Sequence, residues 1–329
     1  MNNLWVDVDI RDRIVIYIDY IIESSEIKLK QLLRMIGISK SKYYKWKERL
    51  GKANSHNCGL PKSNWLLPWE KEAIIDYAKN HYAENDYFLR DGYRRLTYRM
   101  LDEDVAAVSP SSVYRILKTE GLLNQWNTVK TSSKGNGFKQ PTAPHQHWHT
   151  DIKYINFHGS FLFLISVMDG YSRYIVHHEL RANMTKYDAQ LTIQRAKEKY
   201  PDEMPRIISD NGGQFISKDF QEFIKFLELT HIRTSVAYPQ SNGKLERFHR
   251  SIGIECLHTK SFISIEDARE IIANYIDYYN RTRLHSALFY LSPEDFLLGR
   301  EKERVTQREQ KLQQAAIDRE EYWKKNAAA

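Results

Sequence analysis

The spacing of apolar residues changes near residue 145 of this 329-residue chain. Upstream, apolar side chains recur at helical intervals, as they do at Leu29, Leu32, Leu33 and Ile36. Downstream, short apolar runs separated by polar breaks are typical of strands. The pattern therefore predicts an all-α N-terminal part followed by an α/β part.

Two short helices are predicted within residues 27–50. Gly37 is expected to end the first helix, and Ser39 or Ser41 is expected to cap the second. The second helix is rich in aromatic and basic side chains, as are helices that enter a DNA major groove. The segment is interpreted as a helix-turn-helix, and a small αα-hairpin with a solvated basic face is the alternative.

A second helical pattern covers residues 68–122. Ser109 and Pro110 have the pattern of a helix start, and Gly121 that of a helix end. This unit is also interpreted as a helix-turn-helix. The polar segment 124–144, rich in Gly, Ser, Thr and Pro, is expected to be a linker.

Three strand-like runs follow the linker, and they predict a three-stranded meander. Helical and strand-like segments then alternate, which favours a mixed sheet. The charged C-terminal segment is expected to form a helix that is either solvated or in contact with another subunit. The predicted regions are two helix-turn-helix regions, a linker, an α/β core and a charged helical tail, with the boundaries 1–52, 66–123, 124–144, 145–299 and 300–329.

The formal net charge of +7 favours a polyanionic partner. Residues 1–144 hold 23 Lys and Arg against 17 Asp and Glu, whereas residues 145–300 hold 19 of each, so nucleic-acid contacts are expected first in the N-terminal part. Only Cys58 and Cys256 are present, which disfavours a disulfide framework or a cysteine-rich zinc site. The sequence has no apolar run of about 18 residues and no signal-peptide pattern, so a soluble cytoplasmic protein is expected.

Three acidic residues occupy positions where carboxylates could meet. Asp151 lies in the first predicted strand, and Asp210 ends a strand at the carboxyl edge of the sheet, where α/β proteins commonly bind ligands. Glu246 lies early in a predicted helix, with 35 residues between it and Asp210. Gathered carboxylates repel unless cations neutralise them, and such oxygen ligands select Mg²⁺ or Mn²⁺. Each acid alone also has an ordinary interpretation, such as a turn residue or, for Glu246, an ion pair with Arg250.

A rival metal site is suggested by the histidines that precede Asp151. Strand alternation places His145, His147, His149 and Asp151 on one face. Same-face neighbours on a strand are about 6.5–7 Å apart, so all four could hardly bind one ion. Zinc is therefore disfavoured, and His149 is interpreted as a residue that supports Asp151.

Five strings stand in order along the chain: WHTDIKYI (148–155), VMDGYSRYIV (167–176), ISDNGGQF (208–215), YPQSNGKLERFHRS (238–251) and YYNRTRLHSALFYLSPEDF (278–296). Together they resemble the integrase-core transposases of bacterial insertion sequences. GYRRLTYRML and VSPSSVYRILKTEGLL also resemble the helix-turn-helix that precedes this core. The resemblance covers roughly residues 70–297. It implies a multidomain protein of the DDE superfamily, with N-terminal all-α helix-turn-helix units, an α/β ribonuclease-H-like (retroviral integrase) catalytic domain with a mixed five-stranded sheet, and a helical C-terminal tail.

The resemblance also implies a function. It identifies Asp151, Asp210 and Glu246 as a catalytic triad that binds two Mg²⁺ ions, for which Mn²⁺ substitutes. The implied reaction is metal-dependent cleavage at insertion-sequence ends and transfer of the 3′-OH into DNA. The expected partners are double-stranded DNA, as terminal inverted repeats and as target, and further copies of the chain in a dimer or tetramer. The implied location is the bacterial cytoplasm, in association with the nucleoid.

Several further residues receive roles from this comparison. Asp169 matches a position that does not bind metal and is interpreted as structural. Lys153 stands where the family usually has Thr, and it is expected to contact a DNA phosphate or the carboxylates. The supporting residues are His149, Asn211, Gly212 and Asn242. The expected DNA contacts are Lys45, Lys47, Arg94, Arg95, Arg115, Lys153, Lys244, Arg247 and Arg250.

Two other functions are compatible with the same strings. One is a DNA-binding regulator that retains an inactive integrase fold, and the intact triad disfavours it. The other is a nuclease of the same fold that does not join strands. Supplying DNA with pre-cleaved 3′-OH ends would distinguish this nuclease from a transposase.

Overall fold

The computed structural model describes residue 6 and residues 8–52, 64–84, 87, 91–123, 140–233 and 243–327. The chain forms two compact units, one of Met1–Trp65 with Ile317–Ala329 and the other of Leu66–Ala316. The predicted tail is therefore divided between the two units, and the second predicted helix-turn-helix shares a unit with the α/β core. In the described ranges no helix is long and apolar enough to cross a membrane.

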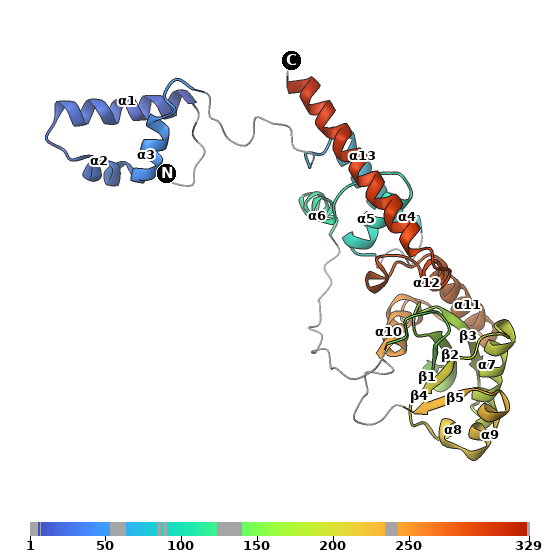
Figure 1. Cartoon of the computed structure of the whole chain (residues 1–329). Helices are drawn as coiled ribbons and strands as arrows, with labels where there is room; N and C mark the ends of the chain where they lie inside the picture. Colours follow the sequence, from blue (N-terminus) through green and yellow to red (C-terminus); the bar gives the residue numbers. More distant parts are fainter. Residues whose placement is uncertain are drawn as a thin grey trace. The chain divides into compact units, whose positions relative to one another are not determined.

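The first unit contains the two short helices that the sequence predicted, α2 (Leu29–Ile36) and α3 (Lys40–Lys47) (Figure 1). Gly37 ends α2 with a left-handed φ of 75°, which a glycine adopts at little cost. The cap of α3 is Ser39, whose hydroxyl accepts a hydrogen bond from the backbone N–H of Lys42. The helical pair is thus confirmed, and DNA recognition by it stays a prediction.

A third helix in this unit, α1 (Val8–Ser24), was not expected from the sequence pattern. Its buried residues Val15 and Ile18 join the hydrophobic core of α2 and α3. Arg11 of α1 is buried and donates from Nη2 to the carbonyl oxygens of Arg49 and Lys52, at 2.7 and 2.8 Å. These bonds hold the segment after α3 against α1.

The second unit begins with a helical region composed of α4 (Pro68–Glu84), α5 (Tyr93–Asp102) and α6 (Pro110–Thr119). The start of α6 is as predicted, because Ser109 accepts a hydrogen bond from the N–H of Ser112 at 3.3 Å and Pro110 occupies the first turn. Gly121 follows the end of α6 with a φ of 68°. The core of the region consists of buried apolar residues from all three helices, among them Ile74, Leu96, Met100, Val113 and Leu117.

The α/β part of this unit is built on one five-stranded sheet with the order β3-β2-β1-β4-β5. The strands are β1 (His147–Phe157), β2 (Ser160–Asp169), β3 (Ile175–Arg181), β4 (Arg206–Ser209) and β5 (Thr230–Arg233). β1, β2 and β3 pair antiparallel, whereas β4 pairs parallel to β1 and β5 parallel to β4. The predicted meander and the predicted mixed five-stranded sheet are therefore confirmed.

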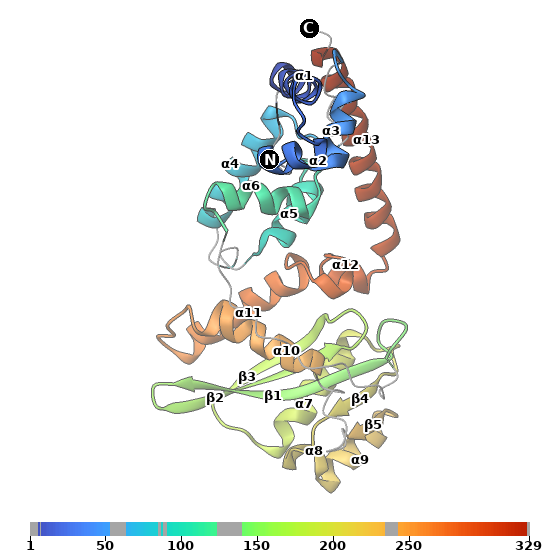
Figure 2. The same ribbon diagram turned by 90° about the vertical axis from the view of Figure 1, so that its left-hand side faces the viewer.

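Helices cover both faces of this sheet (Figure 2). On one face the apolar residues of α7 (Lys186–Lys199), α8 (Gly213–Ile216) and α9 (Lys218–Phe226) pack with Trp148 and Ile207. The opposite face packs with α10 (Gly243–Ile252), the π-helical turn η3 (Gly253–Leu257) and α11 (Ile265–Arg281). α10 is anchored in this second core by Leu245, Phe248 and Ile252.

The chain then forms the turn η4 (Ser286–Leu288), α12 (Pro293–Leu297) and the long helix α13 (Glu301–Ala327). The predicted tail is indeed helical, and the first half of α13 is largely exposed or half-buried, but it also contacts α5 through one buried residue. There Arg308 is buried and donates from Nε and Nη2 to the two carboxylate oxygens of Asp102, at 2.7 and 2.6 Å. This bidentate pair holds α13 against α5, because two parallel hydrogen bonds require one relative orientation of Arg308 and Asp102.

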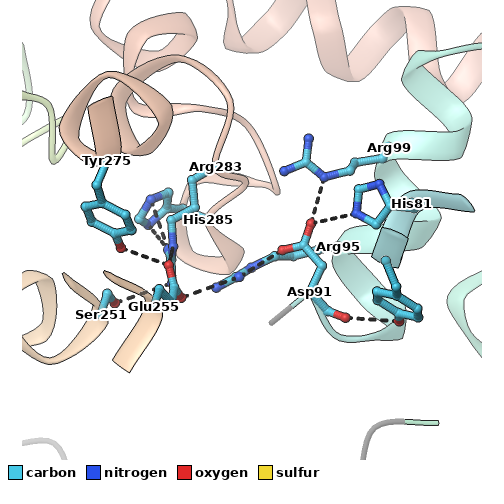
Figure 3. A network of polar contacts seen from close by, with 10 residues as sticks. His81, Asp91, Arg95, Arg99, Ser251, Glu255, Tyr275, Arg283 and His285 are labelled. Atoms are coloured by element: carbon cyan, nitrogen blue, oxygen red, sulfur yellow. Dashed lines mark hydrogen bonds and ion pairs between the residues drawn. The ribbon is translucent and has the colours of Figure 1, made fainter. Parts of the chain in front are cut away.

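A buried carboxylate organises the helical region (Figure 3). The side chain of Asp91 is fully buried and accepts hydrogen bonds from Arg99 Nε at 2.7 Å and Arg95 Nη1 at 3.0 Å, with His81 Nε2 at 3.3 Å. Burial raises the pKa of Asp91, but His81, Arg99 and Arg95 outweigh it and hold that pKa well below its usual range. The carboxylate is therefore charged and compensates two arginines.

We predict that Asp91→Asn lowers the free energy of unfolding by about 3 kcal/mol, because it removes the counter-charge of the buried Arg99 and one of the two acids beside Arg95. Urea unfolding followed by circular dichroism measures the change. The control is Asp104→Asn, at an exposed ion pair with Lys311 and a left-handed φ of 58° that asparagine tolerates. Equal losses in the two variants would contradict the role given to Asp91.

Candidate active site

The geometry of the sheet brings two of the predicted acids side by side. β1 pairs with β4 in the register Trp148 with Ile207 and His149 with Ile208. Because the pairing is parallel, two further residues along each strand lead to Asp151 and to Asp210. Asp210 directly follows the last residue of β4, at the carboxyl edge of that strand.

The turn after β4 holds the carboxylate of Asp210 in place. Its Oδ1 accepts a hydrogen bond from the backbone N–H of Gly212 at 3.0 Å. A Cβ at Gly212 would lie 2.4 Å from Gln214 Nε2 and 3.0 Å from Asp210 Oδ1, so a side chain there would displace the end of Gln214 and crowd the Asp210 carboxylate. The neighbouring Asn211, also predicted to support the site, is exposed.

The third acid approaches from the helix that covers the sheet. Glu246 lies in the first turn of α10 and is exposed. Among the described residues it forms no ion pair with Arg250, so the ordinary interpretation of Glu246 as a salt-bridge partner has no support. Asn242, predicted as a supporting residue, lies outside the described residues.

The charges of the three acids affect one another. The pKa of Asp151 is raised to about 6, chiefly by burial and in smaller part by the charges of Asp210 and Glu246, against the backbone N–H of Ile152 and the charge of Lys153. The N–H of Ile152 donates to Asp151 Oδ1 at 2.8 Å. The site is therefore an electrostatically strained cluster that a bound cation would relieve.

Lys153 lies on the same strand face as Asp151 and reaches the start of η3. Its Nζ is the nearest atom to the position a Cβ would take at Gly253, at 3.9 Å. Burial lowers the pKa of Lys153, and Asp151 opposes that shift. The ammonium therefore lies within van der Waals distance of the start of η3, and it partly compensates Asp151.

His149 and His249 are the histidines near the acids, and sequence reasoning missed the second. His249 Nδ1 lies 3.6 Å from Asp151 Oδ2. Burial and the charge of Lys153 lower the pKa of His249 to about 3, so the ring is neutral. Its position three residues after Glu246 could have indicated a shared face of α10. His149 is fully buried, and a Cβ at Gly170 would lie 2.8 Å from its Nε2, so Gly170 leaves room for this ring.

Asp169 has the structural surroundings that the sequence suggested. Its buried carboxylate accepts hydrogen bonds from the N–H of His145 at 2.8 Å and from the N–H and hydroxyl of Ser172 at 2.7 and 2.6 Å. His145 Nδ1 accepts a hydrogen bond from Trp148 Nε1 at 3.1 Å. Asp169 and His145 Nδ1 thus have hydrogen-bond partners within the fold. Because His145 is one of the four residues of the zinc alternative, that alternative gains no support.

The donors suit a hard divalent cation, since all three are carboxylates, and burial together with the charges of Asp210 and Glu246 raises the pKa of Asp151. Within the described ranges, however, no group of three or more His, Cys, Asp or Glu side chains is arranged to hold a metal ion. The charges of Asp210 and Glu246 therefore act on Asp151, but in the described residues the carboxylates do not form a complete set of metal ligands.

The predicted DNA contacts lie in several places. Lys45, Arg115 and Arg250 are exposed on helices α3, α6 and α10. Lys47 is occupied within its unit, because its Nζ donates to Asp19 Oδ1 at 2.9 Å. Four of the others share one cavity, which is lined in part by Arg94, Arg95, Lys244 and Arg247.

Comparison with known proteins shows what the α/β part of the chain is similar to. Residues 141–239 match one family model described as an integrase core domain, and residues 227–293 match a second with the same description. This part of the chain therefore matches integrase core domains, and the expected resemblance to insertion-sequence transposases of the DDE superfamily is confirmed as a resemblance.

The relatives that match are transposases. The chain is 34% identical over 158 residues to transposase InsF for insertion sequence IS3A of Escherichia coli strain K12, which covers 47% of this chain and 54% of the relative. It is 29% identical over 157 residues to the transposase for insertion sequence element IS904 of Lactococcus lactis, with 47% and 62% covered. The chain thus spans about half the length of the curated relatives it matches. A chain of the simian T-cell lymphotropic virus intasome is 17% identical, with a TM-score of 0.43 over 67% of this chain and 74% of that one.

We predict that Asp151→Asn stabilises the metal-free protein at pH 7 by about 1–3 kcal/mol. The folded-state pKa of about 6 exceeds the ordinary 3.8, so the folded protein holds this proton more tightly than the unfolded chain. Stability of the wild type is therefore expected to fall as pH rises from about 4 to 6, and the variant should lose this dependence. Urea unfolding at several pH values, with chelator present, measures both effects. A variant less stable than the wild type at pH 7 would contradict the strain assigned to Asp151.

Proposed function

We propose that the chain is a DNA transposase that cleaves insertion-sequence ends and joins the resulting 3′-OH to DNA in a metal-dependent reaction. The observation that carries the proposal is the parallel register of β1 with β4, which brings Asp151 beside Asp210, with Glu246 near enough for its charge to act on Asp151. Three carboxylates that lie close together repel one another, and a bound cation would neutralise this repulsion.

Asp151, Asp210 and Glu246 would bind Mg²⁺, with Mn²⁺ as a substitute and two ions per site. When bound, the ions supply activation of the attacking oxygen and stabilisation of the leaving oxygen. The protein's own residues position these ligands: the N–H of Gly212 orients Asp210, and the apolar face of α10 carries Glu246 to the sheet. Lys153 would contact a phosphate close to the acids.

DNA binding would use surfaces outside the acidic cluster. We propose that α2 with α3, and α5 with α6, act as helix-turn-helix units that bind terminal inverted repeats. Lys45, Arg115 and Arg250 are exposed and available for phosphate or base contacts. The chain would act as a dimer or tetramer, since two ends of an element must be paired, in the bacterial cytoplasm and associated with the nucleoid.

Two alternatives remain distinct from this proposal. A regulator with an inactive core would bind element ends without cutting them, and a nuclease would cut but not join. The first is disfavoured by the strained acid cluster, which costs stability without benefit in a protein that binds no metal. A joining assay on pre-cleaved 3′-OH ends separates the second.

We predict that Asp151→Asn, Asp210→Asn and Glu246→Gln each abolish Mg²⁺-dependent nicking and joining while DNA binding stays within about twofold, because each removes one metal ligand. Gel assays on labelled element ends measure both steps. The matched control is Asp202→Asn, at an exposed acid in the turn between α7 and β4, and it should retain full activity. Normal joining by any of the three variants would remove that residue from the mechanism.

We predict that Lys45→Gln weakens binding of the full chain to inverted-repeat DNA by about tenfold and reduces its preference over random DNA, because α3 would present this side chain to base edges. Fluorescence polarisation at one fixed salt concentration measures both affinities. Lys52→Gln removes an equal charge from an exposed position beyond α3 and is the control. An equal loss of affinity for both DNAs would show a phosphate contact and contradict recognition by α3.

A further inference from the structure

A cavity of about 350 Å³ lies against a second face of α10. Lys244, Arg247 and Ser251 of this helix line it, and their spacing places them on one side. Glu246 and His249 occupy the side that faces β1. One helix therefore separates the acidic cluster from this cavity.

The cavity is strongly cationic. Among the described residues, six positively charged side chains and no acidic one line it, and the cations are Arg94, Arg95, Arg173, Lys244, Arg247 and Arg283. The remaining lining consists of glycine, hydroxyl-bearing and aromatic residues and His285. Such a set offers hydrogen-bond donors from several directions to a single ligand.

Two of the six cations are already compensated (Figure 3). Arg283 donates from Nη2 and Nε to the two carboxylate oxygens of Glu255, at 2.6 and 2.7 Å. Arg95 lies between two acids, 3.0 Å from Asp91 Oδ1 and 3.7 Å from Glu255 Oε1. Asp91 and Glu255 are therefore committed to this network, which also connects α5 to η3 and fixes the wall of the cavity.

The other four cations have no such compensation. In the part of the chain that the structure describes, Arg94, Arg173, Lys244 and Arg247 have no carboxylate within 4.0 Å. Lys244 donates to the carbonyl oxygen of Gly170. Burial lowers the pKa of Arg173, and the charges of Arg247 and Arg283 lower it further, against the pull of Tyr279.

The backbone of Arg173 adds a local cost to this arrangement. Its φ of 64° is a left-handed conformation, which an arginine adopts at a cost, and its side chain lines the cavity with the other cations. Uncompensated like charges held at fixed positions weaken a fold unless an anion occupies the space between them.

The cavity is also lined by residues from several sequence strings that contain no member of the acidic triad. Arg94 and Arg95 come from GYRRLTYRML, Arg173 from VMDGYSRYIV, and Arg283 from the segment that begins YYNRTRLHS. These strings, together with YPQSNGKLERFHRS, are those by which the sequence resembles integrase-core transposases. The fold therefore assembles parts of four of them around one cavity.

We propose that this cavity binds a phosphate group, and that the group is a backbone phosphate of the DNA substrate. The identity of the source rests on the proposed function, whereas the phosphate chemistry rests on the cavity. Arginines and a lysine that converge from α5, α10 and the turn before β3 suit the several oxygens of a phosphate, and the hydroxyl of Ser251 adds a neutral donor. A backbone phosphate held here would fix the DNA beside α10, the helix that carries Glu246.

The test uses the full chain without metal ions, so that binding is measured apart from cleavage. The double variant Arg94→Gln/Arg247→Gln changes two exposed side chains that line the cavity and have no carboxylate partner. The control, Lys225→Gln/Lys302→Gln, removes an equal charge from exposed positions on α9 and α13 outside the cavity. Circular dichroism and thermal unfolding check that both variants fold as the wild type does.

One arm measures duplex DNA affinity by fluorescence polarisation between low and moderate salt. The cavity variant should bind about tenfold more weakly than the control. The slope of log affinity against log salt should be smaller by about 0.9, the change for one lost phosphate contact. The other arm titrates inorganic phosphate and follows protein fluorescence, since Tyr93, Tyr279 and Tyr290 line the cavity.

The two arms distinguish the sources of the phosphate. A selective loss of DNA affinity supports the backbone phosphate, and a selective loss of inorganic phosphate binding with unchanged DNA affinity assigns the cavity to a free phosphate ligand. Equal behaviour of the cavity variant and the control in both arms overturns the proposal. Because no step requires Mg²⁺ or strand cleavage, the cavity can pass this test even if the wild-type protein fails to nick DNA, which would instead refute the proposed function.

Discussion

The short parallel pairing of β1 with β4 determines where this protein can perform chemistry. Three paired positions set the register, and that register brings Asp151 beside Asp210 although 58 residues lie between them. Both lie toward the carboxyl edge of β4, where a parallel sheet leaves side chains accessible to a ligand. A shift of one residue would turn Asp151 to the opposite face of the sheet and separate the acids. The buried residues of this pairing, such as Trp148 and Ile207, therefore maintain the geometry of the site as well as the stability of the fold.

The helix α10 gives the site its second half, and its three faces have different roles. Leu245, Phe248 and Ile252 anchor it in the core. Glu246 and His249 approach the acids of the sheet, and Lys244 with Arg247 lines the cationic cavity. A negative and a positive site thus lie on opposite sides of one rigid element. If the cavity binds a backbone phosphate, the same helix positions both the metal ligand and the DNA.

The equal numbers of basic and acidic residues in the core give no sign of this arrangement in the sequence. Residues 145–300 carry equal numbers of basic and acidic residues, which suggested an electrically neutral core. The fold separates these charges: acids gather around Asp151, while basic residues of the core meet those of α5 around the cavity. The network of Asp91, Arg95, Glu255 and Arg283 joins the two regions and limits how far the helical region can move from the core.

The sequence by itself determined most of the local elements, although not α1, and it indicated the three acids. Ser39, Ser109 and Gly121 act at helix ends as their residue types predict, because capping depends on neighbours within a few residues. The strand meander and the spacing of the acids could also be read directly, and the family resemblance gave those acids a shared role. These features are encoded by short stretches of chain.

Only the tertiary structure decided which distant residues meet. The packing of α13 on α5 through Arg308 and Asp102, the approach of His249 to Asp151, and the cavity around Arg173 all join segments far apart in sequence. No local pattern encodes such contacts, because they depend on the register of the sheet and on the rotation of each helix about its axis. That rotation is set by burial of apolar faces, and the polar residues are carried to their partners with it.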